Sequence, residues 1–312
     1  MSSYLSHIIR DHSLDFIGLQ ETHKKTVDSL FRKIDPYQTY EWDFVPYIGK
    51  SGGILCGVRK ERFEGVMWKK GKFILQASFF DNKEKNKWTL CTVYGAAHDK
   101  DKEDFLTELS KFCSHISYPL LIGGDFNILR HAGERTNWQH STYSDLFNSV
   151  INAMCLNEVY MSGGMYTWTN DQSHPTLEKL DRVLMSNDWE DIFPQVNIMK
   201  LVRDVSDHNA LLLSSDNHVV RSPQTREFRF ELSWLKSDEF LPLVEKVWNQ
   251  YVKATDPIDI LNIKLKHFKK FFKVWGSNKF GHERIRKNDI REELRGIEEE
   301  EEKGNTDPGI FL

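Results

Sequence analysis

The stretch that decides the fold is Pro119-Leu120-Leu121-Ile122-Gly123-Gly124-Asp125-Phe126-Asn127. Its first half is a short apolar run, which is typical of a strand buried on both faces. The two glycines that follow permit close approach of the backbone and unusual dihedral angles. The polar side chains of Asp125 and Asn127 come directly after them. The pattern therefore predicts a rigid strand that delivers polar groups to its end, where active sites are commonly built.

Two further polar clusters stand next to strand-like runs. The apolar run 14–19 leads into Gln20-Glu21-Thr22, and Ser206-Asp207-His208 lies close to the run 210–213. Elsewhere, short strands mix with a few amphipathic helices, and no regular strand–helix–strand repeat appears. We expect a hairpin over 73–80 and 87–94, helices over 101–116 and 143–154, and short strands at 51–58, 167–169 and 180–185. This mixture predicts a two-layer sheet core covered by helices.

Length and composition limit the possible domain size, binding partners and cellular compartment of the protein. A chain of 312 residues can bury one large core and carry an appendage. The net charge of −4 excludes a global attraction to nucleic acid or anionic membrane, so any affinity for phosphate comes from local clusters or bound metal. The four cysteines form no CxxC pair, which argues against a zinc site or a disulfide framework. We find no secretory signal and no apolar run near the ~18 residues of a membrane span, and we expect a nuclear or cytoplasmic protein without a membrane partner.

The composition changes near residue 221, where a polar segment broken by proline resembles a linker. We therefore expect a catalytic-type domain over 1–220, a helical extension over 221–297, and an acidic, disordered tail over 298–312. The basic and aromatic run 264–273 has two explanations. It is either a nucleic-acid contact or, as we favour, an amphipathic helix that packs Phe268, Phe272 and Trp275 and solvates its lysines. The oligomeric state stays open.

The polar clusters carry groups suited to metal-assisted hydrolysis. Glu21 suits a magnesium ion, because Mg²⁺ prefers hard oxygen ligands and often uses only one or two protein carboxylates. Asp125 can take a proton from an attacking water, with Asn127 fixing that water or the phosphate. Each group has a simpler alternative, an exposed loop glutamate in the first case and a turn with side-chain-to-backbone hydrogen bonds in the second.

His208 can donate a hydrogen bond to a phosphate oxygen if a carboxylate keeps its imidazole oriented and protonated. Asp207 is its neighbour in sequence, and neighbours on a strand point to opposite sides. Asp207 therefore suits a metal ion better, and Asp181 becomes the candidate partner of His208. A solvated loop is the alternative explanation of Ser206-Asp207-His208.

At these motifs the chain resembles the endonuclease/exonuclease/phosphatase superfamily. Within it, the chain is most similar to the apurinic-type endonuclease domain of LINE-type (non-LTR) retrotransposons. The resemblance spans about residues 4–215. It rests on segments in the family's order: Leu19-Gln20-Glu21-Thr22, Val93-Tyr94-Gly95, Gly124-Asp125-Phe126-Asn127, Tyr166-Thr167-Trp168-Thr169, Leu180-Asp181-Arg182 and Ser206-Asp207-His208.

The resemblance implies an α/β fold, a four-layer αββα sandwich of two mixed β-sheets flanked by helices, with a C-terminal helical extension. It implies DNA as partner, Mg²⁺ (or Mn²⁺) as cofactor, no small-molecule cofactor, and nicking that leaves a 3′-hydroxyl. The implied roles are metal binding by Glu21 and Asp207, catalysis by Asp125, Asn127, Asp181, His208 and Tyr94, and substrate contact by Asn127, Thr167 and Trp168.

One departure from the family concerns the start of the chain. The family begins with a strand that ends in an asparagine, whereas Met1 comes after that point, so we expect the domain to lack this first strand. Losing one preorganised polar group commonly lowers the rate on the order of 10²–10³-fold. A catalytically inactive retroelement remnant is therefore an alternative. A phosphatase of small phosphate esters or inositol phosphates is a further one.

Overall fold

The computed structural model describes residues 2–24, 28–47, 52–137, 141–172, 174–204, 206–215, 230 and 232–304. It divides the chain into two compact units. The first combines residues 1–217 with 298–312, and the second holds residues 218–297. The expected linker around 221–226 lies outside the described residues.

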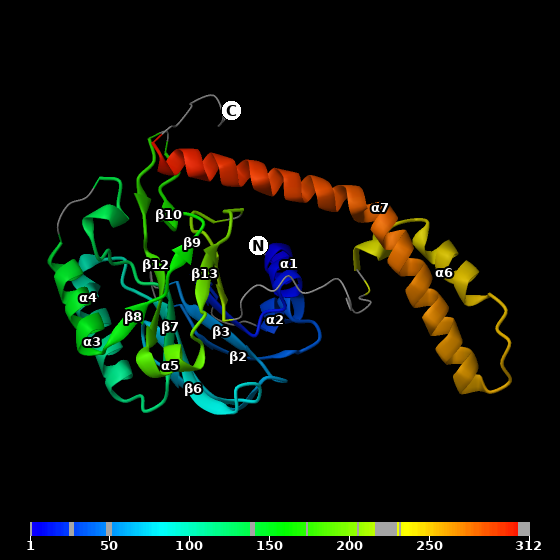
Figure 1. The fold of residues 1–312 in the computed structure, drawn as a ribbon, viewed down its shortest axis with the longest axis horizontal. Coiled ribbons are helices and arrows are strands. Elements are labelled where there is room, and N and C mark those ends of the chain that lie inside the picture. Colours follow the sequence, from blue (N-terminus) through cyan, green and yellow to red (C-terminus); the bar gives the residue numbers. More distant parts are fainter. Residues whose placement is uncertain are drawn as a thin grey trace. The chain divides into compact units, whose positions relative to one another are not determined.

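The first unit is built around a six-stranded sheet (Figure 1). Its strands, in spatial order, are β4 (Phe63–Lys70), β5 (Ile74–Asp81), β6 (Asn86–Tyr94), β7 (Leu120–Asp125), β12 (Asp181–Ser186) and β8 (Leu156–Glu158). β6 and β7 run parallel, and the other neighbours run antiparallel. A parallel pair needs a long crossover, which α3 (Asp99–Ser114) provides. The expected hairpin is thus β5–β6, and the stretch that opened the sequence analysis is the central strand β7.

Helices cover one face of this sheet. α3 and α4 (Thr142–Ala153) bury Phe105, Leu109, Phe147 and Ile151 against Ile122 and Leu184 of the sheet. In each helix the two residues are four positions apart, a spacing that places side chains on one helix face. The hydroxyl of Ser141 caps α4 by accepting a hydrogen bond from the Tyr143 amide.

The second sheet layer consists of two three-stranded sheets packed on the opposite face. One contains β1 (Phe16–Gln20), β3 (Ile54–Arg59) and β2 (Tyr40–Val45); the other contains β14 (Leu211–Ser214), β13 (Asn197–Lys200) and β9 (Met161–Ser162). Within the described part of the chain, β1 and β14 are edge strands of these sheets. A core of apolar residues fills the space between the two layers, and Ile54, Trp88 and Leu121 are almost wholly buried.

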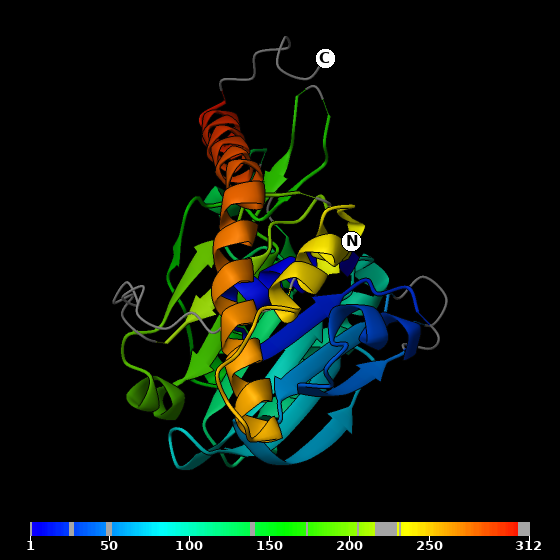
Figure 2. The same ribbon diagram turned by 90° about the vertical axis from the view of Figure 1, so that its right-hand side faces the viewer.

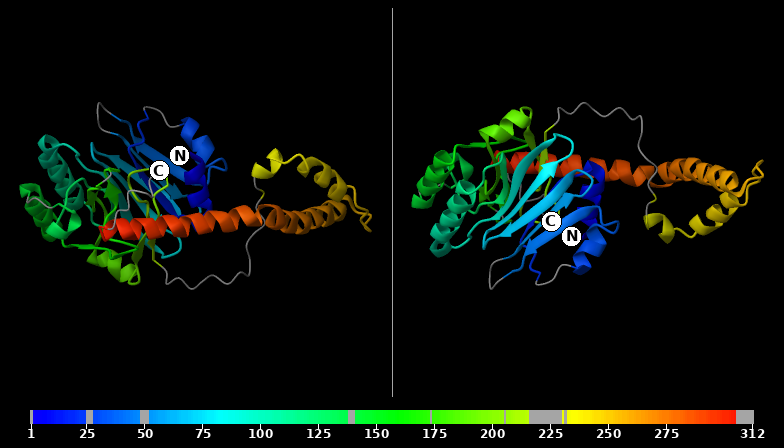
Figure 3. Two further views of the ribbon diagram at one scale, coloured as in Figure 1. Left: turned by 90° about the horizontal axis from the view of Figure 1, so that it is seen from above. Right: turned by 90° about the horizontal axis from the view of Figure 1, so that it is seen from below.

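Two N-terminal helices, α1 (Ser2–His12) and α2 (Asp28–Ile34), complete the outer layer. Phe31 of α2 stacks on Trp42 of β2, with ring centroids 5.4 Å apart. Figures 2 and 3 show these helices beside the blue strands of the second sheet layer, with α3 and α4 on the far side of the six-stranded sheet. The expected four-layer αββα arrangement is confirmed. α1 was not predicted from the sequence.

Shorter elements lie at the two ends of the sheets. β10 (Trp168–Thr169) pairs with β11 (Leu177–Glu178), η1 (Ala132–Glu134) precedes α4, and α5 (Asn187–Ile192) follows β12. Trp189 of α5 packs edge-on against Trp88 of the core, with ring centroids 5.9 Å apart. These pieces matter because β10 carries residues that hold the candidate site together.

The second unit is helical, as expected. It contains η2 (Leu232–Lys236), α6 (Phe240–Trp248) and most of α7 (Pro257–Glu302). Trp234, Phe240, Val247 and Phe272 form its core, with Phe268 and Trp275 packed against it. The run 264–273 is therefore an amphipathic helix, as favoured from the sequence, although α7 is much longer than that run.

The expectation of a disordered tail over 298–312 is wrong for residues 298–302. They form the last turn of α7 and belong to the first unit, where glutamates of this turn pair with Lys200 and Arg203. The rest of the predicted tail from residue 305 lies outside the described residues. Among the helices that the structure describes, none has the length and apolar character needed to cross a membrane.

Candidate active site

Three candidate residues form one row across neighbouring strands of the six-stranded sheet. Tyr94 at the end of β6 stands in register with Asp125 at the end of β7. Asp125 in turn stands in register with Asp181, the first residue of β12. Because residues in register on adjacent strands project to the same face, the strand ladder itself brings these side chains to one end of the sheet.

Asp125 is held rigidly within its loop. Only 4% of the residue is exposed, and its two carboxylate oxygens accept hydrogen bonds from the Asn127 amide at 2.9 Å and the Asn127 Nδ2 at 2.7 Å. Asn127 adopts a left-handed φ of 53° to close this loop. Gly124 has a φ of 141°, and a Cβ there would lie 2.1 Å from the Val93 carbonyl oxygen. The glycine is thus required for β7 to approach β6 closely.

The surroundings of Asp125 favour its protonated form. Burial is the largest cause, and the negative charge of Asp181 adds to it, while His208 and the Asn127 amide act in the opposite direction. Together they raise the pKa of Asp125 to about 7. A carboxyl group with this pKa can both take up and release a proton near neutral pH, which suits a general base.

His208 and Asp181 form a hydrogen-bonded pair. His208 Nδ1 lies 2.8 Å from Asp181 Oδ2, so the carboxylate fixes the orientation of the imidazole. Burial alone would lower the pKa of His208, but the hydrogen bond and charge of Asp181, with smaller contributions from Asp125 and Asp207, raise it to about 9. The ring is therefore an imidazolium at neutral pH, and its Nε2–H can donate to an anionic oxygen.

Thr167, directly before β10, and Trp168, the first residue of β10, support this pair. Thr167 is fully buried, and its hydroxyl accepts hydrogen bonds from the amides of Leu180 and Asp181 at 3.1 and 3.0 Å. This burial contradicts the prediction that Thr167 contacts substrate, since the side chain instead fixes the start of β12. Trp168 is half-buried, and its Nε1 donates to Asp207 Oδ2 at 2.9 Å.

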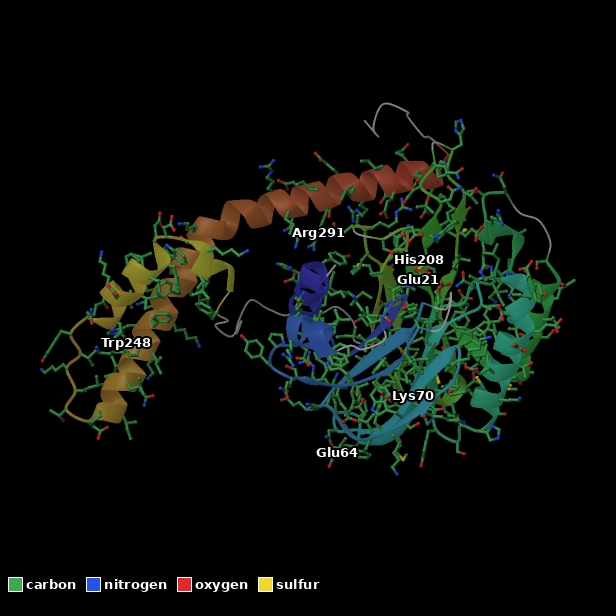
Figure 4. All side chains as sticks on the ribbon, turned by 180° about the vertical axis from the view of Figure 1, so that it is seen from behind. Glu21, Glu64, Lys70, His208, Trp248 and Arg291 are labelled. Carbon is green, nitrogen blue, oxygen red and sulfur yellow. The ribbon has the colours of Figure 1, made fainter. Side chains whose placement is uncertain are left out.

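Glu21 and Asp207 are the candidate metal ligands. The Tyr94 hydroxyl donates to Glu21 Oε1 at 2.7 Å. Burial raises the pKa of Tyr94, and the charges of Glu21, Asp125 and Asp207 raise it further, so all three carboxylates lie around this phenol. In Figure 4 the Glu21 label lies directly below the His208 label, in agreement with the effects of both residues on the pKa of Asp125.

The donor set fits magnesium better than zinc. In the part of the chain that the structure describes, no group of three or more histidine, cysteine or acidic residues is placed to hold a metal ion. Mg²⁺ requires no such cage, because it usually keeps several waters and uses one or two carboxylates together with substrate phosphate. Glu21 and Asp207 meet that description.

A buried polar cluster behind the site was missed in the sequence. Arg182, next to Asp181, donates to Glu134 at 3.0 and 3.1 Å, and its side chain has no exposed surface. Glu158 pairs with Arg130, Lys179 and Arg182. Burial alone would raise the pKa of Glu158, but these cations lower it to about 2. The one available signal was an arginine inside an otherwise apolar strand, since such a residue is buried only with partners.

The comparisons with known proteins concern the family and the fold of the chain. A sequence model of the Endonuclease/Exonuclease/phosphatase family matches residues 2–208. The endonuclease domain of TRAS1, a telomere-specific non-LTR retrotransposon, has a similar solved structure: TM-score 0.53, 14% identity, covering 68% of this chain and 90% of that one. So does the 3′ phosphatase NExo from Neisseria, bound to a product DNA hairpin: TM-score 0.55, 14% identity, covering 69% and 93%.

The comparison with curated protein sequences gave no match. At 14% identity the structural likenesses establish the fold, while the family rests on the sequence match over residues 2–208. The resemblance inferred from the sequence motifs is confirmed at this level. The chain belongs to the endonuclease/exonuclease/phosphatase family.

Proposed function

We propose that this protein is a metal-dependent phosphodiesterase that nicks DNA and leaves a 3′-hydroxyl, as an endonuclease of the retrotransposon type. The observation that carries the proposal is the convergence of Asp125, the Asp181–His208 pair and the Tyr94–Glu21 pair at one end of the sheet. The fold shared with a retrotransposon endonuclease domain and with a DNA-bound 3′ phosphatase supports the choice of substrate.

Each residue of the site has a distinct role in this proposal. Asp125 takes a proton from the attacking water, and Asn127 holds the Asp125 carboxylate in place. His208, oriented by Asp181, donates its Nε2–H to a phosphate oxygen. The Tyr94 hydroxyl donates its one proton to Glu21 and so orients this carboxylate beside the phosphate. Glu21 and Asp207 would hold Mg²⁺ or Mn²⁺, and the ion, when bound, screens the negative charge that develops on the phosphate.

A plasmid-nicking assay tests this proposal. Supercoiled plasmid and Mg²⁺ are incubated with the wild-type protein and with Asp125→Ala, and the relaxed circle is quantified with time. Removing a general base typically lowers the rate by about 10²–10⁴-fold. Asp188→Asn is the matched control, because Asp188 is an exposed carboxylate at the start of α5.

Three results decide the outcome. Nicking by the wild type and Asp188→Asn that chelation abolishes, with almost none by Asp125→Ala, supports the proposal. Extension of the nick by a DNA polymerase reports the 3′-hydroxyl. Equal nicking by wild type and Asp125→Ala rejects the assigned site, and no nicking by any variant favours an inactive retroelement remnant.

Phosphomonoester hydrolysis is the second candidate, because a 3′ phosphatase shares this fold. The same metal and the same His208 could serve it. Release of inorganic phosphate from a 3′-phosphorylated oligonucleotide or from an inositol phosphate, without plasmid nicking, would favour this alternative.

A further inference from the structure

Two cations lie next to the candidate active site. Lys200 ends β13, and Arg203 follows it in the loop that leads to Asp207 and His208. They line a small cavity with Tyr166, Trp168, Leu177 and Asn209. The cavity adjoins the site directly, because Trp168 also donates to Asp207 and Asn209 is the residue after His208.

The last turn of α7 occupies this surface with carboxylates. Lys200 Nζ donates to Glu302 Oε1 at 2.5 Å, and Arg203 Nη2 donates to Glu301 Oε2 at 2.6 Å. Glu298 accepts from the Arg203 amide at 2.7 Å and from Asn209 Nδ2 at 3.1 Å. These contacts leave only 5% of the Lys200 side chain and 18% of the Arg203 side chain exposed.

Only some glutamates of the acidic run 298–302 face the cavity. Glu298, Glu301 and Glu302 face the cavity, whereas Glu299 and Glu300 are exposed. Positions three and four apart lie on the same face of a helix, so the cations meet a row of negative charges. Carboxylates and phosphates bind arginine and lysine through the same charge-assisted hydrogen bonds. The surface that α7 covers therefore suits the backbone of a nucleic acid.

The neighbouring backbone leaves space for this contact. Gly164 has a φ of 125°, and a Cβ there would lie 2.4 Å from Glu302 Oε1 and 2.5 Å from Lys200 Nζ. Its neighbour Met165 donates its amide to Glu302 Oε2 at 2.9 Å. Glu302 is thus held on both carboxylate oxygens, as a phosphate group would be.

We propose that Lys200 and Arg203 form a backbone-phosphate subsite for the DNA strand at the active site, and that Glu301 and Glu302 cover it in the free protein. The inference rests on the proposed function, since it assigns part of the surface on which that substrate lies. DNA and the acidic turn compete for the same two cations, so removing the carboxylates strengthens DNA binding.

The test measures binding without cleavage. A fluorescently labelled DNA duplex is titrated with full-length protein in EDTA, and anisotropy gives Kd between about 50 and 200 mM salt. The variants are Glu301→Gln with Glu302→Gln, and Glu299→Gln with Glu300→Gln. Both double variants change the net charge equally, but only the first changes the contacts of Lys200 and Arg203.

We expect the first double variant to bind about fivefold or more tightly than wild type, the lower end of typical coupling between linked binding events. Two additional phosphate contacts should also steepen the slope of log K against log salt by about 1.8. The Glu299/Glu300 variant should bind like wild type. Adding Lys200→Gln and Arg203→Gln to the first double variant should abolish its gain.

Two outcomes overturn the inference. One is equal affinity of the two double variants. The other is a lower melting temperature of the Glu301/Glu302 variant without any gain in affinity, which would make the contact a purely structural clamp. The assay requires no catalysis, so a protein that never nicks plasmid but shows the gain retains the phosphate subsite and loses only the proposed chemistry. A protein that nicks plasmid but shows no gain in affinity retains the proposed chemistry and loses the phosphate subsite.

Discussion

Replacing Arg182 with methionine tests how strongly the polar cluster behind Asp181 supports the candidate site. The Arg182 side chain is fully buried, and its guanidinium donates to both carboxylate oxygens of Glu134. It also donates to the carbonyl oxygens of Ile128 and Lys179 at 3.2 and 2.8 Å. Methionine retains much of the side-chain length but none of these donors.

The expected loss of stability follows from the carboxylates that Arg182→Met leaves without their guanidinium partner. Glu158 keeps Arg130 and Lys179 as partners. Glu134 is only 7% exposed and loses its guanidinium. Removing one partner of a buried ion pair typically costs about 3–5 kcal/mol. In a domain of about 150–250 residues, each kcal/mol shifts the melting temperature by about 2–4 °C, so we expect a fall of roughly 6–20 °C.

Urea unfolding followed by circular dichroism gives the free energy of unfolding. Adding Glu134→Gln to Arg182→Met should recover part of the loss, because a neutral amide is cheaper to bury than an unpaired carboxylate; the coupling should be about 0.5–3 kcal/mol. Arg32→Met is the matched control at an exposed position of α2. A loss below about 1 kcal/mol for Arg182→Met, or strict additivity with Glu134→Gln, would refute the reasoning.

Three further predictions concern individual contacts. Trp168→Phe removes the donor to Asp207 and should lower the apparent affinity for Mg²⁺ about 10–100-fold, measured by titrating the metal in the nicking assay. An unchanged affinity would exclude this role. Thr167→Val leaves the Leu180 and Asp181 amides without their buried acceptor and should cost about 1–3 kcal/mol per amide in urea unfolding; a neutral effect would contradict it. Because the pKa of Glu158 is lowered from 4.5 to about 2, its stabilisation, on the order of 3 kcal/mol, is present above the unfolded value and disappears as pH falls through about 2. The difference in unfolding free energy between wild type and Glu158→Gln should shrink over that range, and a constant difference would disprove the assignment.

The sequence predicted the strands because their apolar runs are short and end in polar clusters. It also predicted the pairing of His208 with Asp181 rather than with Asp207, from the alternation of side chains along a strand. The structure places the Asp181 carboxylate at His208 Nδ1, although the roles of the two residues in catalysis stay predictions. Local periodicity was sufficient to predict the strands and to argue against Asp207, whereas the choice of Asp181 was supported by the resemblance of Leu180-Asp181-Arg182 to the family motif.

Other features depend on contacts between distant segments. The acidic run was expected to be disordered because its sequence does not reveal Lys200, the partner of Glu302 about a hundred positions earlier. Thr167 was assigned to substrate contact, and only its hydrogen bonds from the amides of Leu180 and Asp181, distant in sequence, show that its hydroxyl points into the protein. The tertiary environment, and not local pattern, decides the burial of a polar side chain.

The alignment of Tyr94, Asp125 and Asp181 on consecutive strands has a consequence for protein engineering. Their mutual spacing is set by main-chain pairing in the middle of the molecule, and a shift of one residue in that pairing would turn all the side chains of a strand to the other face. The surrounding loops are not needed to maintain it. Exchanging the loops that carry none of the groups Glu21, Asn127, Asp207 and His208 for loops from relatives should therefore alter which polymers or small esters are accepted while leaving the reactive groups where they are.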